Sequence, residues 1–61
     1  MNVALERIRQ RARATVNANG RPLVILNLNQ FSPLYVMREF WEGPDKAKGY
    51  VETIQPEGVA Q

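Results

Sequence analysis

The chain has 61 residues, of which 44% are hydrophobic and 23% charged, and its net charge is +2. This length allows a single small domain that buries only about 60% of the surface exposed by its unfolded chain, so stability must come from tight packing or from association. Because the sequence contains no cysteine and no histidine, it excludes disulfides and metal sites built from thiolates or imidazoles.

The first element that the sequence predicts is a helix over residues 2–18. Alanine, leucine, glutamate, arginine and glutamine dominate this stretch, and neither glycine nor proline interrupts it. Asn2 is a candidate N-cap, and Asn19 with Gly20 suits a left-handed C-terminus. At about 100° per residue, one apolar stripe is predicted. Its members are Leu5, Ile8, Ala12, Thr15 and Val16.

A strand remains an alternative for part of this segment. In an extended conformation the arginines at every second position would share one face, and residues 12–16 would pair with residues 23–26 across an Asn-Ala-Asn-Gly turn. Alanine is depleted in strands, and the composition therefore favours the helix.

The second element is a strand within residues 22–29, PLVILNLN, which is apolar almost without interruption. Pro22 has no backbone N–H and is acceptable as the first residue of a strand. Because the apolar side chains alternate between both faces, both faces need a covering layer. We expect the helix to cover one of them and a second copy or another protein to cover the other.

The C-terminal half predicts two further strands. Residues 34–41, LYVMREFW, favour a strand, although Ser32 as N-cap and Pro33 would also permit a short helix there. Residues 42–49 predict an exposed loop, and residues 49–55 alternate, with Tyr50 expected on the face of Glu52 and Ile54. We expect a hairpin between these two strands and a loose tail over residues 56–61.

These elements together predict an α+β fold in a single domain covering residues 1–61. One N-terminal helix packs on a small three-stranded, mainly antiparallel sheet, in the order α-β-β-β.

Five arginines near the N-terminus are the candidates for binding nucleic acid or another anion. In a helix, guanidinium groups spaced four residues apart could contact successive phosphates. The other interpretation is structural: their stems cover the edges of the core and their charges pair with acids of the sheet or of a neighbouring subunit. The candidates are Arg7, Arg9, Arg11, Arg13 and Arg21.

Protein contacts are predicted from large apolar and aromatic residues on the strands. The candidate interface residues are Leu23, Ile25, Tyr35, Trp41 and Tyr50. The acids have no metal-binding spacing and no partner histidine, and Ser32 has no base to activate it. We therefore expect no enzyme activity, cofactor, metal site or small-molecule substrate, and at most a cross-strand pair between Arg38 and Glu52.

One short segment resembles a known family. Residues 20–26, GRPLVIL, are similar to the strand motif of Phd/YefM-type antitoxins, in which a Gly-Arg/Lys-Pro turn leads into an apolar strand that helps to dimerise an operator-binding domain. The sequence departs from that pattern on both sides, where the family has another strand and a longer helix before the motif, and where Phe31-Ser32-Pro33 follows it here. The resemblance assigns no family.

The sequence is thus typical of a non-enzymatic small binding protein. We expect a self-associating or partner-bound structural or regulatory subunit, similar in size and type to many virus-encoded and assembly proteins. The alternatives are a DNA- or RNA-binding regulator that uses the basic helix and an inhibitor of a larger complex. The expected partner is a second copy or a larger protein. No apolar run is long enough for a membrane span, and a cytoplasmic location is the default expectation.

Overall fold

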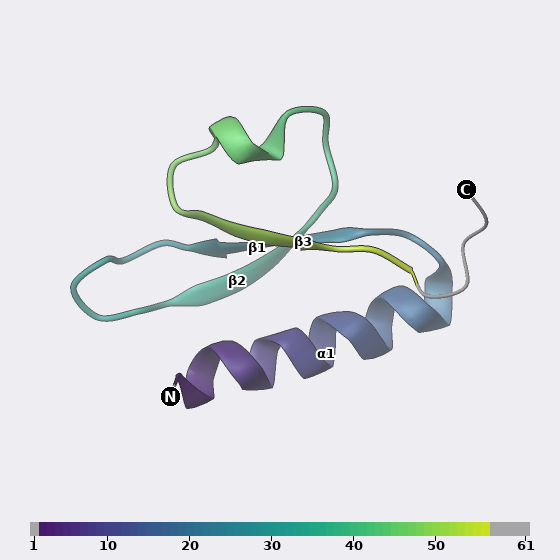
Figure 1. Ribbon diagram of the computed structural model, residues 1–61, viewed down its shortest axis with the longest axis horizontal. Helices are drawn as coiled ribbons and strands as arrows, with labels where there is room; N and C mark the ends of the chain where they lie inside the picture. Colours follow the sequence, from purple (N-terminus) through teal and green to yellow (C-terminus); the bar gives the residue numbers. More distant parts are fainter. Residues whose placement is uncertain (1, 57–61) are drawn as a thin grey trace.

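The computed structural model describes residues 2–56 and confirms the predicted α+β fold, with one helix followed by three antiparallel strands (Figure 1). The elements are α1 (Val3–Asn19), β1 (Leu23–Asn27), β2 (Tyr35–Glu39), the short 3-10 helix η1 (Pro44–Lys46) and β3 (Tyr50–Ile54). Residues 34–41 therefore contain a strand. The tail predicted for residues 56–61 lies, from residue 57 onward, outside the described residues.

The helix begins and ends at the predicted caps. The Asn2 side chain accepts a hydrogen bond from the backbone N–H of Leu5 at 3.0 Å, which satisfies one of the donors that every helix start leaves unpaired. Gly20 has a φ of 72°, and its N–H donates to the Val16 carbonyl at 2.7 Å. Residues 12–16 are helical, so the alternative strand pairing does not occur.

The stripe of α1 that packs on the sheet is narrower than predicted. Ala12 and Val16 are fully buried, and Leu5 and Ile8 pack against the core as partly buried residues. Thr15 is exposed, because it lies at the border of the stripe, where the helix surface turns away from the sheet. The N-terminal half of α1 is thus less deeply covered than the C-terminal half.

The strand order in the sheet is β2-β1-β3. The predicted hairpin between the second and third strands is therefore wrong: β1 forms the hairpin with β2 and pairs with β3 on its other side. Ile25, for example, lies opposite Met37 on one neighbour and opposite Glu52 on the other. The physical reason is that β1 has the longest apolar run, and the central position buries both of its faces.

A β-bulge separates Tyr50 from the rest of β3. Ile25 lies opposite Glu52 whereas Leu26 lies opposite Tyr50, so Val51 is an extra residue in the ladder. Tyr50 consequently lies on the face of Leu26, opposite to Glu52 and Ile54, which corrects the predicted simple alternation. Just before the bulge, Gly49 has a φ of 85°, and any Cβ there would overlap the Asn27 carbonyl oxygen.

The helix-covered face of the sheet contains the main core. Its buried members come from α1, β1 and β3, and the partly buried Tyr35, Met37 and Val51 pack against them. The buried residues are Ala12, Val16, Leu23, Ile25 and Ile54.

The opposite face of the sheet is covered by the chain's own connection between β2 and β3. Figure 1 shows this connection, with η1, on the side of the sheet opposite to α1. Pro44 is buried there, Val24 is fully buried and Leu26 is 9% exposed. This finding corrects two expectations: residues 42–49 are not simply an exposed loop, and β1 does not leave an apolar face open for a second copy.

Candidate protein-binding surface

Within residues 2–56, no strand pairs with the outer edge of β2. Phe40 N–H donates to the Pro22 carbonyl at 3.3 Å, and Leu28 N–H donates to the Leu34 carbonyl at 2.9 Å. Because hydrogen-bonded pairs alternate along an antiparallel ladder, the even-numbered residues of this strand face β1 and the odd-numbered ones direct their N–H and C=O groups outward. The outward residues are Tyr35, Met37 and Glu39.

An open groove of about 550 Å³ runs between this edge and α1. The helix contributes residues three and four positions apart, which lie on one side of α1, and the strand side contributes mainly apolar residues. The residues that matter for its chemistry are Arg7, Ile8, Arg11, Leu34, Val36 and Met37. The groove is therefore apolar at its base and carries two cations along its helical wall.

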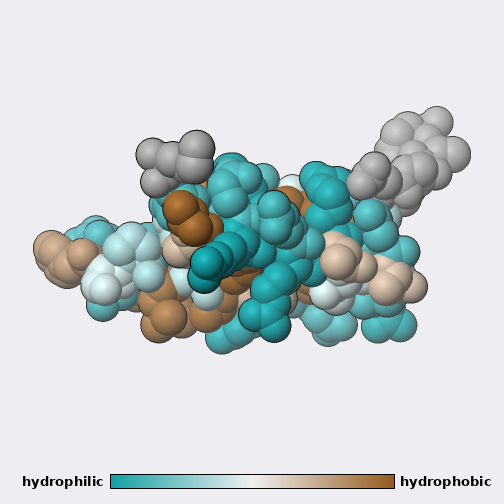
Figure 2. All heavy atoms as spheres, turned by 90° about the horizontal axis from the view of Figure 1, so that it is seen from below, coloured by the Kyte–Doolittle hydropathy of each residue, from teal (hydrophilic) through white to brown (hydrophobic). Residues whose placement is uncertain are grey.

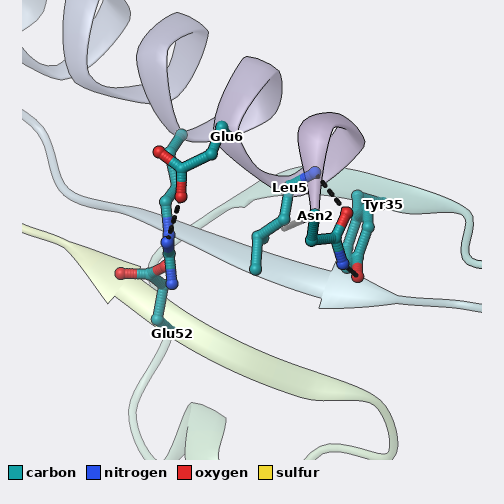
Figure 3. Close-up of polar contacts among 6 residues, drawn as sticks. Asn2, Leu5, Glu6, Tyr35 and Glu52 are labelled. Atoms are coloured by element: carbon teal, nitrogen blue, oxygen red, sulfur yellow. Dashed lines mark hydrogen bonds and ion pairs between the residues drawn. The ribbon is translucent and has the colours of Figure 1, made fainter.

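The opposite side of α1 is closed by an ion-pair cluster (Figure 3). Arg9 Nη1 lies 2.6 Å from Glu6 Oε2, and Arg9 Nε donates to Glu52 on β3. The hydrogen bond to Glu52, followed by that to Glu6, raises the pKa of Arg9 above its ordinary value. Arg9 therefore remains a cation and links helix to sheet, as the structural interpretation of the arginines predicts.

The remaining candidate arginines do not form one basic face. Arg7 and Arg11 have no hydrogen-bond or ion-pair partner among residues 2–56. Arg21 lies 3.8 Å from Glu39 at the exposed surface, and Arg13 also interacts with another residue. Among the five candidate arginines, only Arg7 and Arg11 therefore line a groove without an ion-pair partner in the described part of the chain.

The hairpin tip, residues 28–34, is the most exposed apolar feature within residues 2–56. Leu28, Phe31 and Leu34 are 54%, 90% and 56% exposed. Figure 1 shows the tip extending beyond the sheet, and the view from the helix side shows hydrophobic side chains gathered toward the same end of the molecule (Figure 2). Isolated exposed apolar residues are ordinary, but three on one short turn indicate a contact surface.

Two asparagine side chains hold the tip in a defined conformation. Asn27 Oδ1 accepts hydrogen bonds from the N–H groups of Asn29 and Leu34 at 3.1 and 3.0 Å. Asn29 Oδ1 accepts from Phe31 and Ser32 at 2.9 and 3.2 Å. Such side-chain turns replace a backbone ladder, so the apolar residues are presented on an ordered loop.

The predicted interface residues are scattered. Leu23 and Ile25 lie in the core under α1, so in the single chain they are not available to a partner; their apolar character is explained by the position of β1 in the sheet. Tyr35 and Tyr50 are half-buried on opposite faces, and Trp41 is 38% exposed.

The hairpin tip was not predicted from the sequence as a binding surface. Apolar residues placed among turn-forming asparagine, serine and proline could have indicated an exposed apolar turn. The expected Arg38–Glu52 pair is replaced by Arg9–Glu52, because β1 separates β2 from β3. Arg38 instead donates to the Met37 carbonyl at 3.0 Å, at the outer edge of β2.

Within residues 2–56, no three potential ligands among histidine, cysteine, aspartate and glutamate cluster as a metal site would require. No helix in that range combines the length and apolarity needed to cross a membrane. Comparison of the chain with protein-family models, with curated proteins and with solved structures finds no match.

Proposed function

We propose that the protein is a non-enzymatic binding protein that attaches to a larger protein through the hairpin tip and acts as its structural or regulatory subunit. The observation that carries this proposal is the exposure of Leu28, Phe31 and Leu34 on one turn. Full burial of a side chain of this size is worth about 1.5–3 kcal/mol. The hydrogen bonds of Asn27 and Asn29 pre-order the turn, which lowers the entropy lost on binding.

The charges beside the tip favour a different protein over a second copy. Lys48 lines a hollow together with Leu28 and Phe31, and Arg7 and Arg11 line the neighbouring groove with Leu34. Among the described residues, no acid lines either hollow. Two copies meeting through this end would bring like charges together, whereas a partner with acids around an apolar pocket is complementary.

DNA or RNA binding has less support. Such binding draws its affinity from several cations that contact phosphates together, but Arg9 and Arg21 already face carboxylates of the same chain. The two unpaired arginines border an apolar groove, which suits a protein segment better than a phosphate backbone.

Site-specific photo-crosslinking tests the proposal. A photo-reactive phenylalanine analogue is placed at position 31 and, as a matched control, at position 15, where Thr15 is exposed on α1. In cells of the natural host, we expect position 31 to yield one discrete cross-linked protein and position 15 to yield none.

Three outcomes of the cross-linking experiment would overturn the proposal. They are no cross-linked product from position 31, equal products from both positions, and a product of twice the chain mass, which would indicate self-association. Binding to anionic lipid vesicles that is lost in Phe31→Ser would also overturn it, because it would assign the tip to a membrane surface.

A further inference from the structure

We infer that the groove between α1 and β2 binds an extended, acidic segment of the partner, which pairs with the outer edge of β2 as a fourth strand. This inference rests on the proposed function and names the chemistry of the segment that is recognised. It concerns the groove and the strand edge rather than the hairpin tip, so the two can fail separately.

The backbone of β2 is suited to strand addition. The outward N–H and C=O groups of Tyr35, Met37 and Glu39 recur at every second residue, which is the spacing at which an added strand forms hydrogen bonds. Arg38 donates to the Met37 carbonyl and places a charge at this edge, a common protection of free edges against unwanted pairing. An exposed side chain can turn away when a partner strand arrives.

The edge of β3 is less suitable. The N–H of Tyr50 already donates to the Ala47 carbonyl at 3.2 Å. The bulge at Val51 also breaks the regular alternation of β3. An added strand would therefore find a shorter and less regular row of partners there than along β2.

The side chains define the composition of the segment. On one face, a strand beside β2 would contact the groove's apolar base at Ile8 and Met37, and on the other face it would lie next to Val36. Its path runs along Arg7 and Arg11, whose charges have no partner among the described residues. Because successive side chains of a strand point to opposite faces, an alternating segment can direct its acidic residues into the groove, where Arg7 and Arg11 lie, and its apolar residues toward the face of Val36.

The same arginines oppose pairing between two copies of β2. In a two-fold symmetric dimer, the β2 edge of one copy would pair with the β2 edge of the other. Arg7 and Arg11 of both copies would then line one shared groove. Glu6 on α1 and Glu52 on β3 already bind Arg9.

A defined peptide tests the inference. The probe is a synthetic peptide that alternates valine and glutamate and matches the five residues of β2; the control alternates valine and lysine. Backbone NMR on the intact protein should show the largest shift changes at the amides of Tyr35, Met37 and Glu39. A probe methylated on alternate backbone nitrogens should not bind, because it lacks the ladder donors.

A variant pair tests the role of charge. Arg11→Gln should weaken binding of the valine-glutamate peptide by roughly tenfold, because a charge-assisted contact is lost. Arg13→Gln removes the same charge from a residue that does not line the groove and should leave the affinity nearly unchanged.

In the peptide experiment, the inference is overturned if the valine-glutamate peptide does not bind, if the lysine control binds equally well, or if the methylated probe still binds. It is also overturned if the chemical-shift changes map to β3. In the variant experiment, it is overturned if Arg13→Gln weakens peptide binding as much as Arg11→Gln does. A specific cross-link at position 31 without peptide binding would remove this inference and leave the proposed function intact. Peptide binding without such a cross-link would remove the proposed role of the hairpin tip and leave the peptide-binding groove intact.

Discussion

The two sides of α1 carry arginines at the same spacing but have opposite surroundings. On the paired side, Arg9 binds Glu6 and Glu52, and this cluster joins the helix to β3. On the groove side, Arg7 and Arg11 face the apolar base beside β2 and have no partner among residues 2–56. The comparison teaches that the strand facing an arginine, rather than the arginine pattern, decides whether its charge is structural or available for binding.

The two sides also differ in how the sheet ends. β3 is irregular at its bulge and contributes the buried Ile54, whereas β2 is regular, and among the described residues no strand pairs with its outer edge. The paired side should therefore contribute more to stability, and the groove side more to binding. Four pairs of substitutions test that division.

The largest effect is expected from truncation of the core under the paired side. Ile54 is 3% exposed, so Ile54→Ala should lower the free energy of unfolding by about 2–5 kcal/mol, through lost burial and a residual cavity. Met37→Ala on the groove side should cost less, because Met37 is only partly buried. Urea denaturation of both variants measures the difference; a larger loss for Met37→Ala would contradict the comparison.

The next largest effect concerns Gly49, which precedes the bulge in β3. Gly49→Ala forces an L side chain into positive φ, at about 1–2 kcal/mol, and also overlaps the Asn27 carbonyl. Gly20→Ala is the matched control, since its φ of 72° is similar but no atom lies within 4 Å of the new Cβ. Thermal unfolding should show a larger loss for Gly49→Ala, and equal losses would argue against the close approach.

The third test concerns Asn2, which attaches the start of α1 on the groove side. Its side chain caps the helix and donates to the Tyr35 hydroxyl at 2.6 Å (Figure 3). Asn2→Ala should cost about 0.5–2 kcal/mol. Asn2→Ser retains a capping oxygen but cannot donate in the same way to Tyr35, so its stability should be intermediate. If Asn2→Ser were no better than Asn2→Ala, the cap would not be the stabilising contact.

The smallest effect is expected from the arginines themselves. Arg9→Gln should reduce stability slightly, and added salt should shrink the difference from the parent, because the ion pair is partly exposed. Arg7→Gln, an identical change on the groove side, should leave stability unchanged. Because the pKa of Arg9 is raised, its contribution is present throughout neutral pH and is lost only as pH rises through that raised value. Chemical denaturation at low and high salt distinguishes the two variants; equal losses would remove the distinction between the two sides.

The sequence by itself determined the local structure. Helix-forming residues between Asn2 and Gly20 specify α1 and both of its caps, because the interactions involved connect residues three or four positions apart. The apolar run of β1 likewise predicted a strand that needs cover on both faces. These predictions are correct because each depends on neighbouring residues.

Only the tertiary structure decided which strands pair and which charges meet. Sequence adjacency suggested a hairpin between β2 and β3, yet the connection between them is long enough to cross the sheet and cover Val24 and Leu26. That crossing frees the outer edge of β2, and β3 brings Glu52 to Arg9. Strand order, the bulge and the groove all depend on contacts between distant segments, and these are selected by the burial of the whole core rather than by any local pattern.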